Sequence, residues 1–373
     1  MNERMARRVL VLIAVLLTGA AISFALFVSH SSPCGPVPAL PANAKLMKAA
    51  VARCYGAPDV VRIEDVEKPT PAADEVLVKV HAAAVNPLDW HRVRGTPYYL
   101  SRKRNGFGAP REPRLGVDFA GTVEAVGPDV THFKPGDQVF GARTGAFAEY
   151  VVVSASRMIV HMPPNVSFEQ AAATNVAAIT ALQALRDWGH ITAGEKVLIN
   201  GASGGVGTFA VQIAKAYGAQ VTGVCSTANV GLVRSIGADR IIDYKKNDFT
   251  EGEARYDLIV DMVGNHSLLD LRRVLEPRGA VVIVGSAENR KWFGSMADRL
   301  EADVLNVLVS QDFLRMRSDL TKNDLLVVRG LLRTGKVVPI IDRRYGLREL
   351  PAALGYLETG RARGKVVIDV AGE

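Results

Sequence analysis

The feature that most constrains the fold of this chain is a glycine-rich turn between two regular segments. Residues 197–199 (VLI) form a short apolar run, residues 200–207 read NGASGGVG, and apolar side chains then recur at helical spacing. The pattern Ala202-x-Gly204-x-x-Gly207 is a dinucleotide-binding fingerprint with alanine at its first position. Strand, turn and helix in this order predict one βαβ unit of a parallel sheet.

The glycines of this turn suit a pyrophosphate group. Gly204 lets the backbone approach the phosphates, and Gly207 lets the helix pack closely on the strand. The start of the helix adds unpaired N–H groups and the positive end of the helix dipole. The sequence therefore predicts a dinucleotide site at this turn, with a purely structural turn as the alternative.

The end of the next strand bears on cofactor choice. An NAD site normally places Asp or Glu about 20 residues further on, where it binds the ribose 2′-hydroxyl. Here residues 221–224 run into Cys225 without an acidic side chain. Candidates for binding a 2′-phosphate are Ser226, Thr227, Tyr244, Lys245 and Lys246. The sequence favours NADP(H) and leaves NAD(H) open, and the lysines could also be ordinary surface residues.

The rest of the chain divides into β-rich and α/β parts. Alternating segments such as residues 75–80 (EVLVKV) predict a compact, mostly β domain. Apolar strands at residues 258–260 and 281–284 alternate with helical stretches, which predicts a parallel sheet covered on both faces. The predicted parts are residues 1–28 (charged N-terminus and membrane segment), 29–46 (Pro-rich linker), 47–170 (β domain), 171–310 (nucleotide-binding domain) and 311–373 (a segment returning to the β domain).

An uncharged apolar run occupies residues 9–28. A helix of about 20 such residues can cross a bilayer, and the run lies between Arg8 and the Pro-rich residues 29–46. It is long for a signal peptide, so we expect a single-pass N-terminal membrane anchor. A cleaved signal peptide and a twin-arginine signal are the alternatives. The arginines before the run would place the body outside the cytosol, whereas a nicotinamide cofactor is expected inside, so the side stays open.

Composition excludes several classes of protein. Hydrophobic residues make up 48% and charged residues 22% of the chain, which excludes a disordered protein. The net charge of +7 is not gathered in a long basic run, so we expect no nucleic-acid partner. The three cysteines, Cys34, Cys54 and Cys225, are far apart, so neither a disulfide framework nor a cysteine zinc site is indicated.

From Met47 onward the sequence resembles the zinc-independent medium-chain dehydrogenases/reductases of the quinone oxidoreductase group. The matching stretches are AAAVNPLDW (82–90), LGVDFAGTVEAVG (115–127), FKPGDQVFG (133–141), GAFAEYVVV (145–153), ITALQAL (179–185), NGASGGVGTFAVQIAKAYGA (200–219), SIGADRIIDY (235–244) and GRARGKVVIDV (360–370). The resemblance implies an α/β fold with a GroES-like β domain and a Rossmann domain. It also implies frequent formation of homodimers.

The resemblance assigns roles to individual residues. Asn86 would line the nicotinamide end of the site as the catalytic residue. The implied cofactor-binding residues are Thr180, Ser203, Gly204, Gly205, Val206, Gly207, Ser226, Thr227, Tyr244, Val263, Gly264, Gly285, Ser286 and Lys365. Zinc-dependent relatives carry ligands where this chain has Asn86 and Val117-Asp118, so no metal site is expected.

Together with the glycine-rich turn, the resemblance implies a zinc-free, NAD(P)H-dependent oxidoreductase that transfers hydride to a quinone or another activated carbonyl compound. Such electrophilic small molecules accept hydride without a metal. The alternatives are a reductase of enone or alkenal double bonds, an alcohol dehydrogenase-type activity, and a membrane-tethered NADP-binding interaction protein without turnover.

Overall fold

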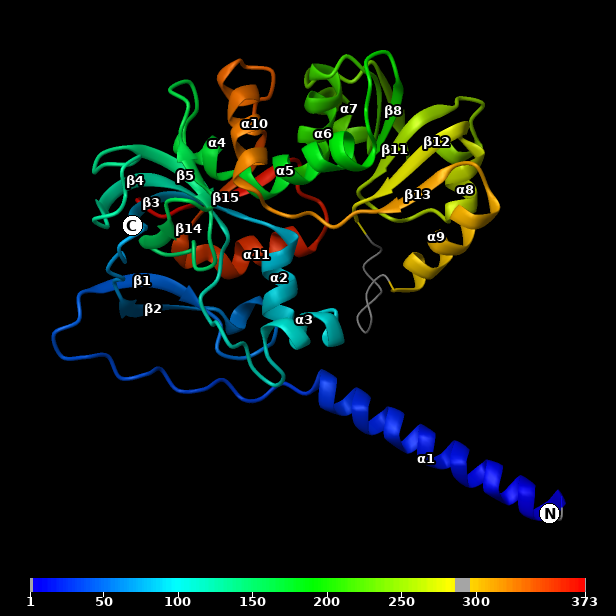
Figure 1. Ribbon diagram of the computed structural model, residues 1–373, viewed down its shortest axis with the longest axis horizontal. Helices are drawn as coiled ribbons and strands as arrows, with labels where there is room; N and C mark the ends of the chain where they lie inside the picture. The colour runs from blue at the N-terminus through cyan, green and yellow to red at the C-terminus, as the bar shows by residue number, and fades with distance from the viewer. Residues whose placement is uncertain (1–2, 286–295, 373) are drawn as a thin grey trace.

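The computed structural model describes residues 3–285 and 296–372, and it shows two large sheets side by side with a long helix projecting from the body (Figure 1). One sheet is mostly antiparallel and the other is parallel. This confirms the predicted α/β architecture of a β domain joined to a doubly wound domain.

Helix α1 (Glu3–Ser29) covers the apolar N-terminal run, but the predicted transmembrane anchor is wrong. Over the parts of the chain that the structure describes, no helix combines the length and the apolar character needed to cross a membrane. The end of α1 instead packs on the body: Val28 is buried, and the ring of Phe27 lies 5.2 Å from that of Phe107. The predicted membrane location of this chain is therefore wrong.

The segment after α1 is attached to the β domain. Cys34 forms a disulfide with Cys54, which the spacing of the cysteines did not indicate. The backbone N–H of Ser32 donates to the carbonyl of Gly108 at 2.9 Å, and the guanidinium of Arg102 donates to the carbonyl of His30. These contacts join residues that are distant in the sequence, so no local sequence pattern predicts them.

The first sheet is assembled from both ends of the body. Its strand order is β14-β15-β3-β4-β5-β7, with β6 also paired to β3. Its strands are β3 (Glu75–Val85), β4 (Asp118–Val126), β5 (Gln138–Ala142), β6 (Tyr150–Ser154), β7 (Ile159–His161), β14 (Ile341–Gly346) and β15 (Lys365–Asp369). A separate pair is formed by β1 (Leu46–Val51) and β2 (Arg62–Glu67). The helical elements around them are η1 (Pro58–Val60), α2 (Pro87–Arg94), α3 (Tyr98–Asn105), α4 (Phe168–Ala172), η5 (Leu347–Glu349) and α11 (Leu350–Glu358).

The second sheet is parallel, with the order β10-β9-β8-β11-β12-β13. Counted from β8, this is the 3-2-1-4-5-6 order of doubly wound dinucleotide-binding domains. Its strands are β8 (Lys196–Asn200), β9 (Gln220–Cys225), β10 (Arg240–Asp243), β11 (Tyr256–Asp261), β12 (Leu275–Ile283) and β13 (Asp312–Arg315). The helical elements are α5 (Asn175–Gln183), η2 (Ala184–Trp188), α6 (Gly205–Ala216), η3 (Thr227–Asn229), α7 (Val230–Ser235), η4 (Phe249–Glu251), α8 (Leu268–Arg273), α9 (Met296–Leu308) and α10 (Lys322–Arg333).

One apolar cluster connects the two sheets. It contains Phe140 of β5, Ile179 and Leu182 of α5, and Ile199 of β8, all of which are fully buried. Helix α5 is almost wholly buried because it packs against both domains. Since close-packed interiors resist relative movement, this shared core sets the position of the two sheets, and the candidate site lies where their loops meet.

Candidate functional site

The glycine turn links β8 to α6 as the sequence predicts. Gly201 adopts φ +85°, a backbone conformation that favours glycine. A Cβ at Gly207 would lie 2.1 Å from the carbonyl oxygen of Gly201, so the start of α6 packs directly on the turn. A Cβ at Gly204 would have only that same oxygen nearby, at 3.4 Å. The protein itself therefore leaves open the space above Gly204 that the fingerprint reserves for phosphates.

The C-terminal segment crosses this turn. The backbone N–H of Gly364 donates to the carbonyl of Ser203 at 2.9 Å. A Cβ at Gly205 would lie 3.4 Å from Cδ of Lys365. The structure thus places Lys365 beside the predicted pyrophosphate turn, although the two are distant in the sequence.

A buried carboxylate joins the ends of the central strands. Asp261, at the end of β11, accepts hydrogen bonds at one oxygen from Asn200 Nδ2 at 2.9 Å and from the N–H groups of Val263 and Gly264 at 3.0 Å. Gly285 has no room for a side chain, because a Cβ there would lie 2.0 Å from the carbonyl oxygen of Met262, just after β11. The predicted residues Val263, Gly264 and Gly285 therefore gather at the same sheet edge as the glycine turn.

Two further observations concern this edge. Asp261 was not predicted as a site residue, although an acidic residue at the end of an apolar strand can be recognised in the sequence. The predicted cofactor residue Ser286 lies outside the described residues.

Asn86, the predicted catalytic residue, belongs to a buried polar cluster. Its side-chain oxygen accepts from Nζ of Lys365 at 2.5 Å, and its Nδ2 donates to Asp118 at 2.9 Å. Nζ of Lys365 lies 3.6 Å from the same carboxylate. The backbone N–H of Asn86 donates to Asp89 at 2.8 Å, as part of the N-terminal cap of α2. Two cluster members, Asp89 and Asp118, were not predicted as site residues. Asp118 meets Lys365 only because β4 and β15 both pair with β3, whereas Asp89 joins the cluster through its local bond to Asn86.

Burial dominates the ionisation of this cluster. It raises the pKa of Asp89 to about 7 and also raises the pKa of Asp118, while it lowers the pKa of Lys365. The charges of Lys365 and Asp118 oppose these shifts by stabilising one another. Nζ of Lys365 thus lies beside the carboxyl group of Asp118 in a site almost without water contact.

The cluster does not fit a zinc ion. Zinc prefers thiolate and imidazole ligands in tetrahedral sites, whereas here an amide, carboxylates and an ammonium meet. In the segments with described side chains, no three His, Cys, Asp or Glu residues are grouped so as to hold a metal ion.

The predicted 2′-phosphate residues lie together at the ends of β9 and β10. Ser226 precedes the short turn η3, and the backbone N–H of Tyr244 donates to the carbonyl of Cys225 at 3.1 Å. The hydroxyl of Thr227 donates to Asp243 at 2.6 Å. Ser203 of the glycine turn reaches the same region by accepting from Asn229 Nδ2 at 2.9 Å.

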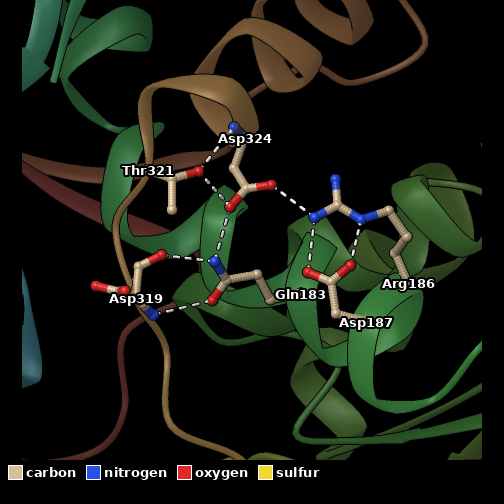
Figure 2. A network of polar contacts seen from close by, with 6 residues as sticks. All are labelled: Gln183, Arg186, Asp187, Asp319, Thr321 and Asp324. Carbon is tan, nitrogen blue, oxygen red and sulfur yellow. Dashed lines mark hydrogen bonds and ion pairs between the residues drawn. The ribbon is translucent and has the colours of Figure 1, made fainter. Parts of the chain in front are cut away.

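Thr180 lies on α5, where its hydroxyl donates to Ser318 at 3.2 Å. Next to this contact is a polar network that joins α5 to the start of α10 (Figure 2). The side chain of Gln183 bonds to both the N–H and the carbonyl of Asp319, at 3.1 and 2.6 Å, and to Asp324 at 2.8 Å. Arg186 completes the network by donating to Asp324 at 2.6 Å. The network holds the segment after β13 against the helix that carries Thr180.

Comparison with known families and proteins agrees with this geometry. Residues 72–164 match the alcohol dehydrogenase GroES-like domain, and residues 236–368 match a family described as zinc-binding dehydrogenase. The human mitochondrial NAD(P)H oxidoreductase RTN4IP1 is 33% identical, over 80% of this chain and 82% of its own. The human quinone oxidoreductase is 32% identical, over 87% of this chain and 98% of its own.

Two further relatives extend the comparison. The 2-methylene-furan-3-one reductase of Solanum lycopersicum is 33% identical, over 86% of this chain and 79% of its own. The structure of Escherichia coli quinone oxidoreductase complexed with NADPH superposes with a TM-score of 0.73 at 26% identity, covering 87% of this chain and all of that chain.

Proposed function

This chain belongs to the medium-chain dehydrogenase/reductase family of oxidoreductases, with quinone oxidoreductase-like relatives, and we propose that it reduces a quinone or another activated carbonyl compound with NAD(P)H and without zinc. The observation that carries the proposal is the turn between β8 and α6. It combines a closely packed Gly207 with open space above Gly204, at the carboxyl edge of a sheet with the dinucleotide-binding order.

The residues around the turn fit a dinucleotide. The start of α6 has no side-chain cap, so its first N–H groups, next to Ser203 and Gly205, are available to phosphates. Asp261 holds the loop of Val263 and Gly264 at the same edge, where the nicotinamide end would pass. Ser226, Thr227 and Tyr244 gather at the adenosine end, and the hydroxyls of Ser226 and Tyr244 favour NADP(H). When bound, the reduced nicotinamide supplies the hydride.

The buried cluster supplies positive charge to the acceptor. Lys365 bridges the glycine turn and Asn86, so its ammonium lies between the cofactor turn and the predicted catalytic residue. Negative charge develops on a carbonyl oxygen when hydride is transferred to it or to a conjugated carbon. A fixed cation in a water-poor site stabilises that charge more strongly than water does. Asp118 and Asn86 keep the ammonium in place.

This cation also supports the absence of zinc. Asn86 and Asp118 already bind the ammonium of Lys365, and neither is a thiolate or an imidazole. We therefore expect the purified protein to contain no stoichiometric zinc and to keep its activity after prolonged chelation.

Reduction of an enone or alkenal double bond is the second candidate. It requires the same cofactor turn and the same stabilised oxygen, and the tomato relative is a 2-methylene-furan-3-one reductase. Alcohol dehydrogenase-type activity has less support, because no group of the cluster activates a simple alcohol as a metal would. The absence of a nucleic-acid partner and the formation of a homodimer remain predictions from the sequence.

The test is a steady-state assay of the full chain. NADPH and NADH are each combined with a panel of quinones, enones, alkenals and simple alcohols, with and without a chelator. We expect turnover of quinones or enones that survives chelation and is lost on substitution of Gly204. Cofactor oxidation by none of the panel, or activity that follows a zinc content of one ion per chain, would refute the proposal.

A further inference from the structure

The adenosine end of the candidate site contains a carboxylate that the neighbouring strand supplies. Strands β9 and β10 are parallel neighbours, and Asp243 stands opposite Cys225 in their register. The ends of both strands therefore meet at one edge, and Asp243 lies beside Ser226 and Thr227. No acid follows β9 in the sequence, but the fold provides one from β10.

Asp243 is held firmly in this position. One carboxylate oxygen accepts the hydroxyl of Thr227 at 2.6 Å, and the other accepts the backbone N–H of Lys245 at 3.1 Å. Its side chain is 11% exposed, whereas the side chain of Tyr244 beside it is largely open to solvent. The hydrogen bond from Thr227 is the main reason that the pKa of Asp243 lies below its usual range, so the carboxylate is ionised at neutral pH.

This arrangement opposes a 2′-phosphate in two ways. The fixed negative charge repels a phosphate dianion, whereas the 2′-hydroxyl of NADH carries no charge to repel. The hydroxyl proton of Thr227 is directed to Asp243, so Thr227 offers the ligand only lone pairs, which do not suit a phosphate. Two exposed lysines carry positive charge that attracts a phosphate and so acts against Asp243. Lys246 Nζ lies 3.9 Å from Asp243, and Lys245 Nζ lies 5.2 Å from the centre of the Tyr244 ring.

Resting on the proposed function, we propose that Asp243 is a specificity-determining residue that weakens the binding of NADPH relative to NADH. Lys245 and Lys246 act against it, and the balance of these charges sets how strongly the chain prefers either cofactor. The acid that selects for an unphosphorylated ribose thus comes from the third strand of the sheet instead of the second.

The experiment measures the dissociation constants of NADPH and NADH by fluorescence titration of the full chain. We expect Asp243→Asn to tighten NADPH binding about tenfold at low ionic strength and to leave NADH binding within about threefold, because only the charge is removed. The gain should shrink as salt is added. Replacing both Lys245 and Lys246 by Met should weaken NADPH binding and spare NADH binding.

Asp239→Asn is the matched control. Asp239 lies just before the other end of β10 and pairs with Lys215, so its substitution changes the net charge equally without touching the adenosine end. NADPH binding that is unchanged or weakened in Asp243→Asn, with an unchanged melting temperature, would overturn this inference alone. A wild-type chain that binds neither cofactor would refute the proposed function and this inference with it.

Discussion

Adding one methyl group is expected to weaken cofactor binding at Gly204 and to lower the stability of the fold at Gly207. Gly204 has φ −81° and ψ 177°, which any residue adopts, and a Cβ there would approach the protein no closer than 3.4 Å. Gly204→Ala should therefore leave the free energy of unfolding unchanged, or raise it by about 0.4–1 kcal/mol because alanine lowers the conformational entropy of the unfolded chain. The methyl group would occupy the phosphate position, so NADPH binding should weaken at least about tenfold, or about 1.4 kcal/mol.

Gly207→Ala should instead damage the fold. Its Cβ would lie 2.1 Å from the carbonyl oxygen of Gly201 and 2.9 Å from Cα of Ala202, both rigid backbone atoms. Overpacking of this kind costs about 1–3 kcal/mol, which corresponds to a lower melting temperature by about 2–12 °C for a domain of this size.

Two measurements separate these effects. Fluorescence titration gives the dissociation constant of NADPH, and circular dichroism gives the melting temperature. Gly231→Ala on α7 is the control, because a Cβ there would have no neighbour within 4 Å. Wild-type affinity in a folded Gly204→Ala protein would refute the assignment of this turn to the pyrophosphate. An unchanged melting temperature in Gly207→Ala would refute the packing argument.

Three further predictions concern stability. The folded pKa of Asp89 is raised from 3.8 to about 7, so its contribution to stability is complete below about pH 4 and is lost as the pH rises through 7; Asp89→Asn should flatten this part of a stability–pH curve measured by urea unfolding. Cys34→Ser removes the disulfide that closes a loop with a sequence separation of 20, and it should lower the free energy of unfolding by about 3 kcal/mol. A reductant should cause the same loss in the wild type and no loss in the variant. Gln183→Ala removes three hydrogen bonds to Asp319 and Asp324 and should cost about 2–4 kcal/mol in chemical denaturation; a loss below about 0.5 kcal/mol would contradict the network of Figure 2.

Short-range patterns were sufficient for the framework of this protein. The turn at residues 200–207 was readable because strand, glycines and helix follow one another directly, and because Gly201 and Gly207 have local steric reasons to be glycine. The alternation of strands and helices was sufficient for a parallel sheet, since periodicity reports which faces are buried. The apolar run of residues 9–28 was sufficient to predict a helix, but its predicted role as a membrane anchor was wrong.

The tertiary structure alone decided which side chains meet. Lys365 reaches Asn86 across 279 residues of sequence, and Thr227 reaches Asp243 only because β9 and β10 are neighbours. The bond between Cys34 and Cys54 likewise depends on how the segment after α1 lies on the body. A residue's type and its local spacing determine its own conformation, whereas charge pairing, burial and pKa depend on neighbours that only the packing of the whole chain brings into contact.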